Sequence, residues 1–345
     1  MSQTFPELGF YALAGQPESP RDLIEEVQQG ETLGLGTAFL SERYNSKEIC
    51  TLSGAAGATT ESIQIATAAT NHNTRHPIVT AGYALTMHGL TGGRFTLGIG
   101  RGIAPMQKAY GIPSITTDQM EDFVQVTRRL LAGEAVLGHD GPIGEYPYLQ
   151  LGPDVADEVP FLLTAFGPNS LALGGRAFDE IVLHTYFSDE TTERAVKTVK
   201  RSAEEAGRDP ASVKVWSCFA TIGDHIDEET RLMKSVGRLA TYLQGYGELL
   251  IDTNGWDRAV LERFRADELV SNFRGGIDVH ATVEQLEHIA TLIPDEWLAY
   301  SATGSPERCV EAIRHQRSLG CDGVILHGAS PEDLEPIVEA YRRNV

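Results

Sequence analysis

The sequence lacks the features of secreted, metal-binding and membrane proteins. It has four cysteines in 345 residues, and Cys50, Cys218, Cys309 and Cys321 follow neither CxxC nor metal-site spacing. No run approaches the roughly 20 apolar residues that cross a bilayer. The first 15 residues also lack the basic start and long apolar core of a signal peptide. We therefore expect a reduced, cytoplasmic protein with no metal site.

Positive charge is scarce. Lys and Arg total 28 against 48 Asp and Glu, which gives a net charge of −20 at pH 7. Such a chain is repelled by phosphate backbones and anionic lipid headgroups, so we expect neither nucleic acid nor a membrane as a partner. If the ligand is a small anion, its site must be locally basic against this background.

Nucleotide-binding glycine motifs are also missing. Residues 91–102, TGGRFTLGIGRG, place glycines at 98, 100 and 102, so the third glycine does not fit G-x-G-x-x-G. These glycines lie at the end of the fourth strand that the sequence predicts, instead of the first, and no Walker A sequence occurs. In a barrel, these glycines leave room at the mouth and let backbone N–H groups approach a flat or anionic ligand. The alternative is a tight strand exit without a ligand.

Short apolar runs alternate with helical patterns along the chain. Eight of these runs predict strands, at residues 8–13, 37–40, 62–69, 95–99, 159–163, 179–183, 213–222 and 323–326. Nearly all precede a helix, and Ser-Pro steps at 19–20, 305–306 and 330–331 are typical helix starts. We predict an α/β fold, a (β/α)8 TIM barrel in a single domain over residues 1–345. Insertions are expected near 134–160, as a hairpin, and near 227–300, mostly helical.

Four stretches, in order along the chain, resemble the luciferase-like monooxygenase superfamily. They are residues 31–45 (ETLGLGTAFLSERYN), 62–102 (SIQIATAATNHNTRHPIVTAGYALTMHGLTGGRFTLGIGRG), 166–185 (FGPNSLALGGRAFDEIVLHT) and 303–328 (TGSPERCVEAIRHQRSLGCDGVILHG). The resemblance implies a TIM barrel that binds coenzyme F420 or FMN at the carboxyl ends of its strands. It favours the F420-dependent branch, which transfers hydride. The alternatives are a monooxygenase using reduced FMN and O₂, and a non-catalytic flavin-binding protein.

The resemblance also implies catalytic positions. Glu42 stands where relatives carry an acid beside the deazaflavin head, although it could simply pair with Arg43 or Arg75. Arg43 replaces the acid–base His of sugar-phosphate-oxidising relatives, and a guanidinium is a poor proton shuttle. Ile103 replaces their Glu base. The substrate is therefore expected to need no proton removed from a hydroxyl, as in reduction of activated C=C or C=N bonds or hydride exchange with a one-carbon carrier.

The implied cofactor contacts lie at four strand ends. They are Glu42, Thr67, Ala68, Thr70, Gly100, Arg101, Gly102, Met106, Phe166, Gly167, Asn169 and Ser170. In F420-dependent relatives the strand end at residues 67–70 contains a non-proline cis peptide. Residues 166–170 begin a helix whose free N–H groups suit a phosphate. Arg101 and Arg176 are candidate counter-charges, although Arg176 could instead pair with Asp179.

Two histidines end predicted strands. His184 closes the sixth strand, where relatives contact substrate, and His327 closes the eighth. Each is a candidate for chemistry, but a lone histidine is more often structural. Trp256 either packs within the insertion or lines the substrate pocket. Relatives often dimerise, so we expect a homodimer that acts on a small molecule.

Overall fold

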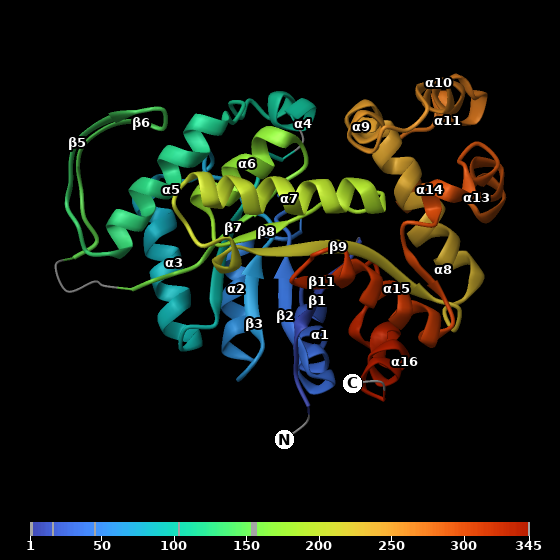
Figure 1. The fold of residues 1–345 in the computed structure, drawn as a ribbon, viewed down its shortest axis with the longest axis horizontal. Helices are drawn as coiled ribbons and strands as arrows, with labels where there is room; N and C mark the ends of the chain where they lie inside the picture. The colour runs from blue at the N-terminus through green and yellow to red at the C-terminus, as the bar shows by residue number, and fades with distance from the viewer. Residues whose placement is uncertain (1–2, 16, 45, 103, 153–156, 344–345) are drawn as a thin grey trace.

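The computed structural model describes residues 3–15, 17–44, 46–102, 104–152 and 157–343. Within this part of the chain, eight parallel strands close into a barrel in the order β1-β2-β3-β4-β7-β8-β9-β11, with β11 pairing back to β1 (Figure 1). All eight predicted strands are present, and the predicted TIM barrel is confirmed. Their bounds are β1 Phe5–Tyr11, β2 Leu35–Leu40, β3 Gln64–Thr67, β4 Phe95–Ile99, β7 Phe161–Thr164, β8 Glu180–Val182, β9 Lys214–Gly223 and β11 Gly323–His327.

Helices surround the barrel. They are α1 Asp22–Leu33, α2 Ile49–Ala58, α3 Pro77–Thr91, α4 Ala104–Ala109, α5 Thr117–Leu131, α6 Pro168–Ala177, α7 Asp189–Glu205, α15 Pro306–Ser318 and α16 Pro331–Arg342. Two of the Ser-Pro steps start helices, because Ser305 and Ser330 accept N–H bonds from the first turns of α15 and α16. The first step does not. Ser19 caps only a short turn, and α1 begins at Asp22.

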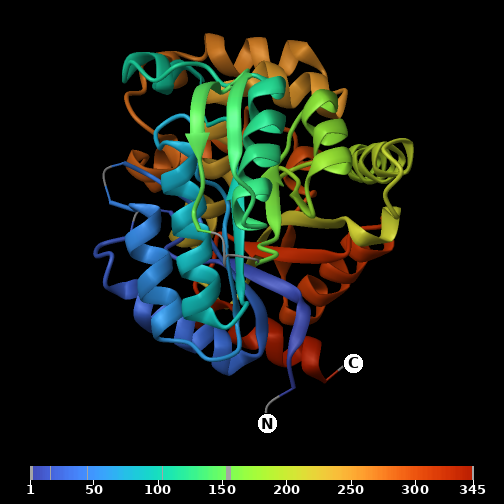
Figure 2. The same ribbon diagram turned by 90° about the vertical axis from the view of Figure 1, so that its left-hand side faces the viewer.

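Both insertions have the expected character. The first contains the antiparallel hairpin of β5 Val136–Gly141 and β6 Gly144–Leu149. The second is helical: α8 Glu228–Leu232, a π-helical turn η2 Met233–Gly237, α9 Arg238–Asn254, α10 Arg258–Ala266, α11 Glu268–Asn272, α12 Ile277–His280, α13 Val283–Ala290 and α14 Asp295–Leu298. A short strand β10 Ala302–Gly304 then pairs with the end of β9, and a 3₁₀ turn η1 Pro210–Ser212 precedes β9. The hairpin and the helical insertion lie at opposite sides of the molecule (Figures 1 and 2).

The helical insertion has a hydrophobic core of its own. Leu239, Phe264 and Leu286 are completely buried among its helices. The same cluster includes Tyr186 and Ala220, which follow β8 and lie in β9. Burial of this apolar surface stabilises the packing of the insertion against the β8–β9 side of the barrel, by roughly 25 cal/mol for each Å² buried. Trp256 stacks on Trp297 at 4.3 Å between ring centroids, so it packs within the insertion.

The alternating glycines are explained by strand packing. The Thr67 hydroxyl donates to the Gly98 carbonyl (2.8 Å) and accepts from the Gly98 N–H (2.6 Å). A Cβ on Gly98 would lie 1.7 Å from the Thr67 carbonyl oxygen, and one on Gly100 would lie 2.3 Å from Thr164 Oγ1. Gly102 has a φ of +67°, which turns the chain out of β4. The first two glycines are therefore required by the barrel itself, whatever binds at its mouth.

No helix among the described residues is long and apolar enough to span a membrane.

Candidate active site

Glu42 lies at the carboxyl end of β2, where an ion pair holds it. Its carboxylate lies 2.5 Å from an Arg75 guanidinium nitrogen and accepts the Thr70 hydroxyl at 2.6 Å. Side-chain exposure is only 6% for Glu42 and 17% for Arg75, so solvent screens the pair weakly. Of the two partners that the sequence allowed, the structure selects Arg75. Arg43 turns to the β1 side and donates to the Gly15 carbonyl at 3.0 Å.

A hollow opens beside this ion pair. It has a volume of about 340 Å³ and is lined by Glu42, Tyr44, Glu48, Thr74, Arg75 and Ile112. Glu48 caps α2 through the N–H groups of Cys50 and Thr51 and also lies 3.0 Å from Arg75. Burial opposes ionisation of Glu48, but these N–H bonds and the guanidinium outweigh it and lower its pKa to about 2. Arg75 is thus shared by the carboxylates of Glu42 and Glu48 at the edge of the barrel mouth.

The end of β3 is locked to both neighbouring strands. The Ala68–Ala69 peptide bond is cis, as the resemblance implies. Ala68 N–H donates to the Leu40 carbonyl at 2.6 Å, and Thr70 N–H donates to the Gly98 carbonyl at 3.0 Å. The structure brings Thr70 next to Glu42, whose N–H donates to the Ala69 carbonyl, whereas Thr67 is completely buried with its hydroxyl bonded to Gly98.

Arg101 lies at the exit of β4 with part of its guanidinium unsatisfied. Its Nη2 donates to the Thr117 hydroxyl, while its buried Nε has no partner among the described residues. Burial lowers the pKa of Arg101, which indicates a partly dehydrated cation. Met106, on α4, is 49% exposed. Ile103 lies outside the described residues.

The first turn of α6 lies at the end of β7, beside β4. Gly167 is its N-cap and has no side chain to cap the helix, so the first N–H groups stay available. Asn169 is exposed and Ser170 is partly exposed. A helix N-terminus attracts an anion, and Arg101 follows the adjacent strand. These neighbouring groups form a suitable place for a phosphate.

His184 lies just beyond β8, and both of its ring nitrogens are engaged. Nδ1 lies 2.8 Å from the Thr185 carbonyl and Nε2 lies 2.9 Å from the Tyr246 hydroxyl. Burial lowers the pKa of His184 to about 4, so the ring is neutral at pH 7. Nδ1 therefore donates to the carbonyl, and Nε2 accepts the tyrosine proton. Phe166 packs on the same ring at 4.4 Å between centroids.

Comparison with known proteins identifies the family. The profile of the luciferase-like monooxygenases matches residues 5–342. The chain belongs to this family. It is 27% identical over 324 residues to a 5,10-methylenetetrahydromethanopterin reductase of Methanolobus tindarius, covering 91% of this chain and 92% of that protein.

Two solved structures share the luciferase-like fold over nearly the whole chain. The coenzyme F420 dependent tetrahydromethanopterin reductase of Methanopyrus kandleri superposes with a TM-score of 0.82 at 18% identity, covering 99% of both chains. An F420-dependent secondary alcohol dehydrogenase, in complex with an F420-acetone adduct, superposes with a TM-score of 0.70 at 18% identity, covering 99% of this chain and all of that one (100%).

In this luciferase-like chain, two of the sequence interpretations need correction or extension. Arg176 pairs with Glu121 at 2.6 Å and not with Asp179, which instead binds Arg128 at 2.7 Å. Arg176 therefore joins α6 to α5. Sequence reasoning also missed Tyr246, whose φ of −154° and ψ of 36° interrupt α9. Its hydroxyl bond to His184 Nε2 distinguishes it from Tyr242, which contacts the same imidazole only through its ring.

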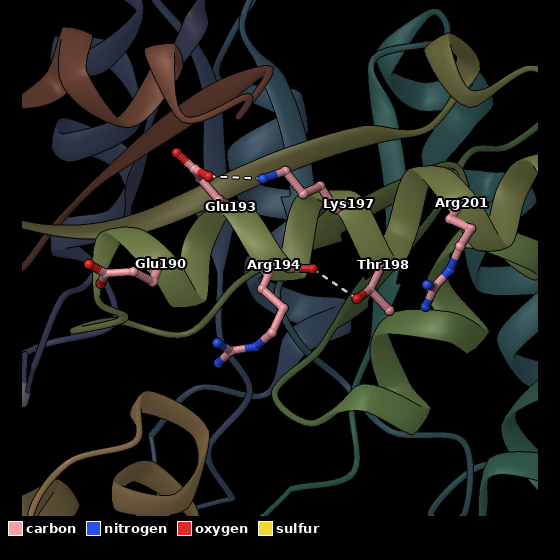
Figure 3. Close-up of a pocket in the computed structure, with 6 residues that line it drawn as sticks. All are labelled: Glu190, Glu193, Arg194, Lys197, Thr198 and Arg201. Atoms are coloured by element: carbon pink, nitrogen blue, oxygen red, sulfur yellow. Dashed lines mark hydrogen bonds and ion pairs between the residues drawn. The ribbon is translucent and has the colours of Figure 1, made fainter.

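A second hollow, of about 450 Å³, lies outside the luciferase-like barrel mouth. Its lining comes from a single helix, α7, as Figure 3 shows: Glu190, Glu193, Arg194, Lys197, Thr198 and Arg201. Two acidic residues are followed there by three basic ones, and Lys197 pairs with Glu193 at 2.9 Å. None of the strand-end residues lines this hollow, so it is not part of the candidate site.

A third histidine, His72 in the loop after β3, predicts acid sensitivity. It is 7% exposed, stacks on Phe123, and has a buried Nδ1 without a partner among the described residues. Burial lowers its pKa to about 4. Because the unfolded value is near 6.5, the unfolded chain binds more protons between these values, and stability falls as pH drops through this window. When the pH is lowered from 7.5 to 5, the unfolding free energy of the native chain should therefore fall by about 2 kcal/mol more than that of His72→Phe, as measured by urea unfolding. An unchanged difference at the two pH values would contradict this.

Proposed function

We propose that this chain is an F420-dependent oxidoreductase that transfers a hydride between the deazaflavin and a small organic substrate. Family membership and the names of its relatives support the reaction class. The barrel mouth supports the cofactor, since an unsatisfied Arg101 nitrogen and an uncapped α6 N-terminus follow the neighbouring strands β4 and β7 and would suit a phosphate. When bound, F420 supplies a carbon-centred hydride donor or acceptor.

Each group of the chain has a role in this proposal. The first turn of α6, at Asn169 and Ser170, binds the cofactor phosphate together with Arg101. Glu42 would face the deazaflavin head, and Arg75 holds its carboxylate in place. Ala68 and Thr70 would leave room for the ring with their small side chains. Gly100 and Gly102 expose the backbone at the same edge, and Met106 and Phe166 supply apolar surface.

The protonation states favour a substrate with an already electrophilic carbon. Glu42 is held by Arg75, Arg43 is a guanidinium, and His184 is neutral with both ring nitrogens engaged. These candidate groups therefore provide no free base to remove a hydroxyl proton. Reduction of an iminium-type C=N bond needs no such base. Addition of hydride to the carbon would turn the π electrons into the nitrogen lone pair. This matches the one-carbon-carrier class that the reductase relatives suggest.

Cofactor titration tests the proposal. Purified protein should quench F420 fluorescence with a micromolar Kd, and FMN should bind at least 100-fold more weakly. Reduced F420 should then be oxidised under anaerobic conditions by a methylene-tetrahydropterin, a cyclic imine or an enone. Tight FMN binding with O₂ consumption would favour the monooxygenase alternative. F420 binding without turnover of any acceptor would favour a non-catalytic binding protein.

Replacing His184 should separate positioning from proton transfer. We expect His184→Gln to lower kcat less than tenfold, because the imidazole orients Tyr246 without exchanging a proton. The kcat of both proteins should be independent of pH between 6 and 9. A loss of a thousandfold or more, or a pKa in the kcat profile that disappears in the variant, would show instead that His184 is an acid–base catalyst.

The homodimer remains a prediction that sedimentation can test.

A further inference from the structure

Three cationic side chains meet at the β1–β2 side of the barrel mouth. The Arg43 guanidinium donates to the Gly15 carbonyl at 3.0 Å. An Arg238 guanidinium nitrogen lies 3.9 Å from where a Cβ on Gly15 would be, so both guanidinium groups flank one glycine. Lys47 is 2% exposed and donates its ammonium proton to the Leu13 carbonyl. This arrangement is unusual in a chain with a net charge of −20.

The facing acids do not neutralise the cluster completely. Asp278 pairs with Arg238 at 2.7 Å and also accepts the Thr241 hydroxyl. Glu26 accepts the Leu13 N–H at 2.7 Å, and its charge and that of Lys47 act on each other. Among the described residues, no carboxylate forms an ion pair with Arg43. Three cations thus face two acids.

The pKa shifts agree with this crowding. Burial, followed by the charge of Arg238, lowers the pKa of Arg43. Burial, followed by Arg43, lowers the pKa of Lys47 to about 8. Burial, followed by Arg238, lowers the pKa of His327 to about 3. An anion placed between the two guanidinium groups would oppose the part of these shifts that comes from the neighbouring positive charges.

We propose that Arg43 and Arg238 bind a carboxylate of the substrate. The inference rests on the proposed function, because the arginines would hold the carboxylate near β1 and β2 while the reactive carbon would face the cofactor. A single negative charge matches the one uncompensated positive charge, and guanidinium groups bind carboxylates in a planar fork. Lys47 is a positioning residue that holds the turn at Leu13, whose φ is +54°.

The location separates this subsite from that of the cofactor phosphate. In the order of the barrel, Arg43 follows β2 and Arg238 comes from the insertion between β9 and β11, next to β1. Arg101 and the α6 N-terminus follow β4 and β7, across the ring. Tyr242 connects the subsite to the centre, since Arg238 lies 6.0 Å from its ring centroid and His184 lies 4.9 Å from it.

Calorimetry with a matched pair of probes tests the subsite without requiring turnover. The probes are 4-aminohippurate, which carries one carboxylate, and its neutral amide, each titrated into the F420-loaded protein. We expect the carboxylate to bind at least tenfold more tightly than the amide. Arg43→Gln and Arg238→Gln should each remove this preference. Arg265→Gln should keep it, because Arg265 lies in the same insertion but pairs with Glu248 at the surface.

Two further measurements keep the result unambiguous. The double variant Arg238→Gln/Asp278→Asn removes both charges of this ion pair. If the Arg238 guanidinium binds the carboxylate, this variant must also lose the preference for the carboxylate probe over the amide. The Kd of F420 should stay unchanged in every variant. Equal binding of the two probes, or a parallel loss of F420 affinity that assigns the arginines to the cofactor's acidic tail, would overturn the subsite. Carboxylate binding without any oxidation of reduced F420 would keep the subsite and refute the proposed function.

Discussion

Replacing Gly98 by alanine is expected to prevent the barrel from folding. The new Cβ would lie 1.7 Å from the Thr67 carbonyl oxygen and 2.9 Å from Leu162 Cδ2. The oxygen belongs to the backbone of β3, and reciprocal hydrogen bonds between Thr67 and Gly98 hold the two strands in register. Relieving the clash between the new Cβ and this oxygen would require separating two strands of a closed barrel. We expect a loss of at least about 4 kcal/mol, against a typical total stability of roughly 5–15 kcal/mol.

Soluble yield, circular dichroism and urea unfolding measure this effect. The matched control is Gly82→Ala in the middle of α3, where a Cβ meets nothing within 4 Å. Because glycine costs helix stability relative to alanine, the control should gain about 0.5–1 kcal/mol. A Gly98→Ala protein within 1 kcal/mol of the native chain would show that β3 and β4 can move apart.

The barrel was predictable because each strand is a short, nearly continuous apolar run. Strands buried on both faces read this way in any parallel sheet. The helix α2, ICTLSGAAGA, is not predictable from its sequence pattern, because its small residues give no amphipathic stripe. Glu48 holds its first turn through two N–H bonds. The start of α1 was misplaced because a Ser-Pro step fits a turn as well as a helix N-terminus.

The site was predictable only where it follows strands. Glu42, Arg101 and the start of α6 come directly after β2, β4 and β7, so the fold brings them to the same end of the barrel. Arg238 and Tyr246 could not be found in the same way. They lie in the helical insertion, where no strand order fixes direction, and their contacts depend on how the insertion packs against the barrel. The ligand roles of all these residues remain proposals.

Breaking the Glu42–Arg75 pair is the second change with a large expected effect. Glu42→Gln keeps the shape of the side chain but leaves the largely buried Arg75 guanidinium (17% exposed) with only the more exposed Glu48 as a charged partner. Truncating one partner of a buried pair typically costs 3–5 kcal/mol, and Glu48 should keep this loss near about 3 kcal/mol. We also expect the Kd of F420 to rise at least tenfold, measured by fluorescence quenching.

A double variant then separates the two possible roles of Glu42. Glu42→Gln/Arg75→Leu removes both buried charges, so it should recover most of the stability in urea unfolding. If the Glu42 carboxylate contacts the deazaflavin, the weak F420 binding should persist in the double variant, because stability returns and the ligand contact does not. If F420 affinity returns together with stability, Glu42 is only a structural partner of Arg75. Arg129→Leu is the matched control, because its pair with Glu134 is 46% and 55% exposed, and such pairs contribute about 0–1 kcal/mol.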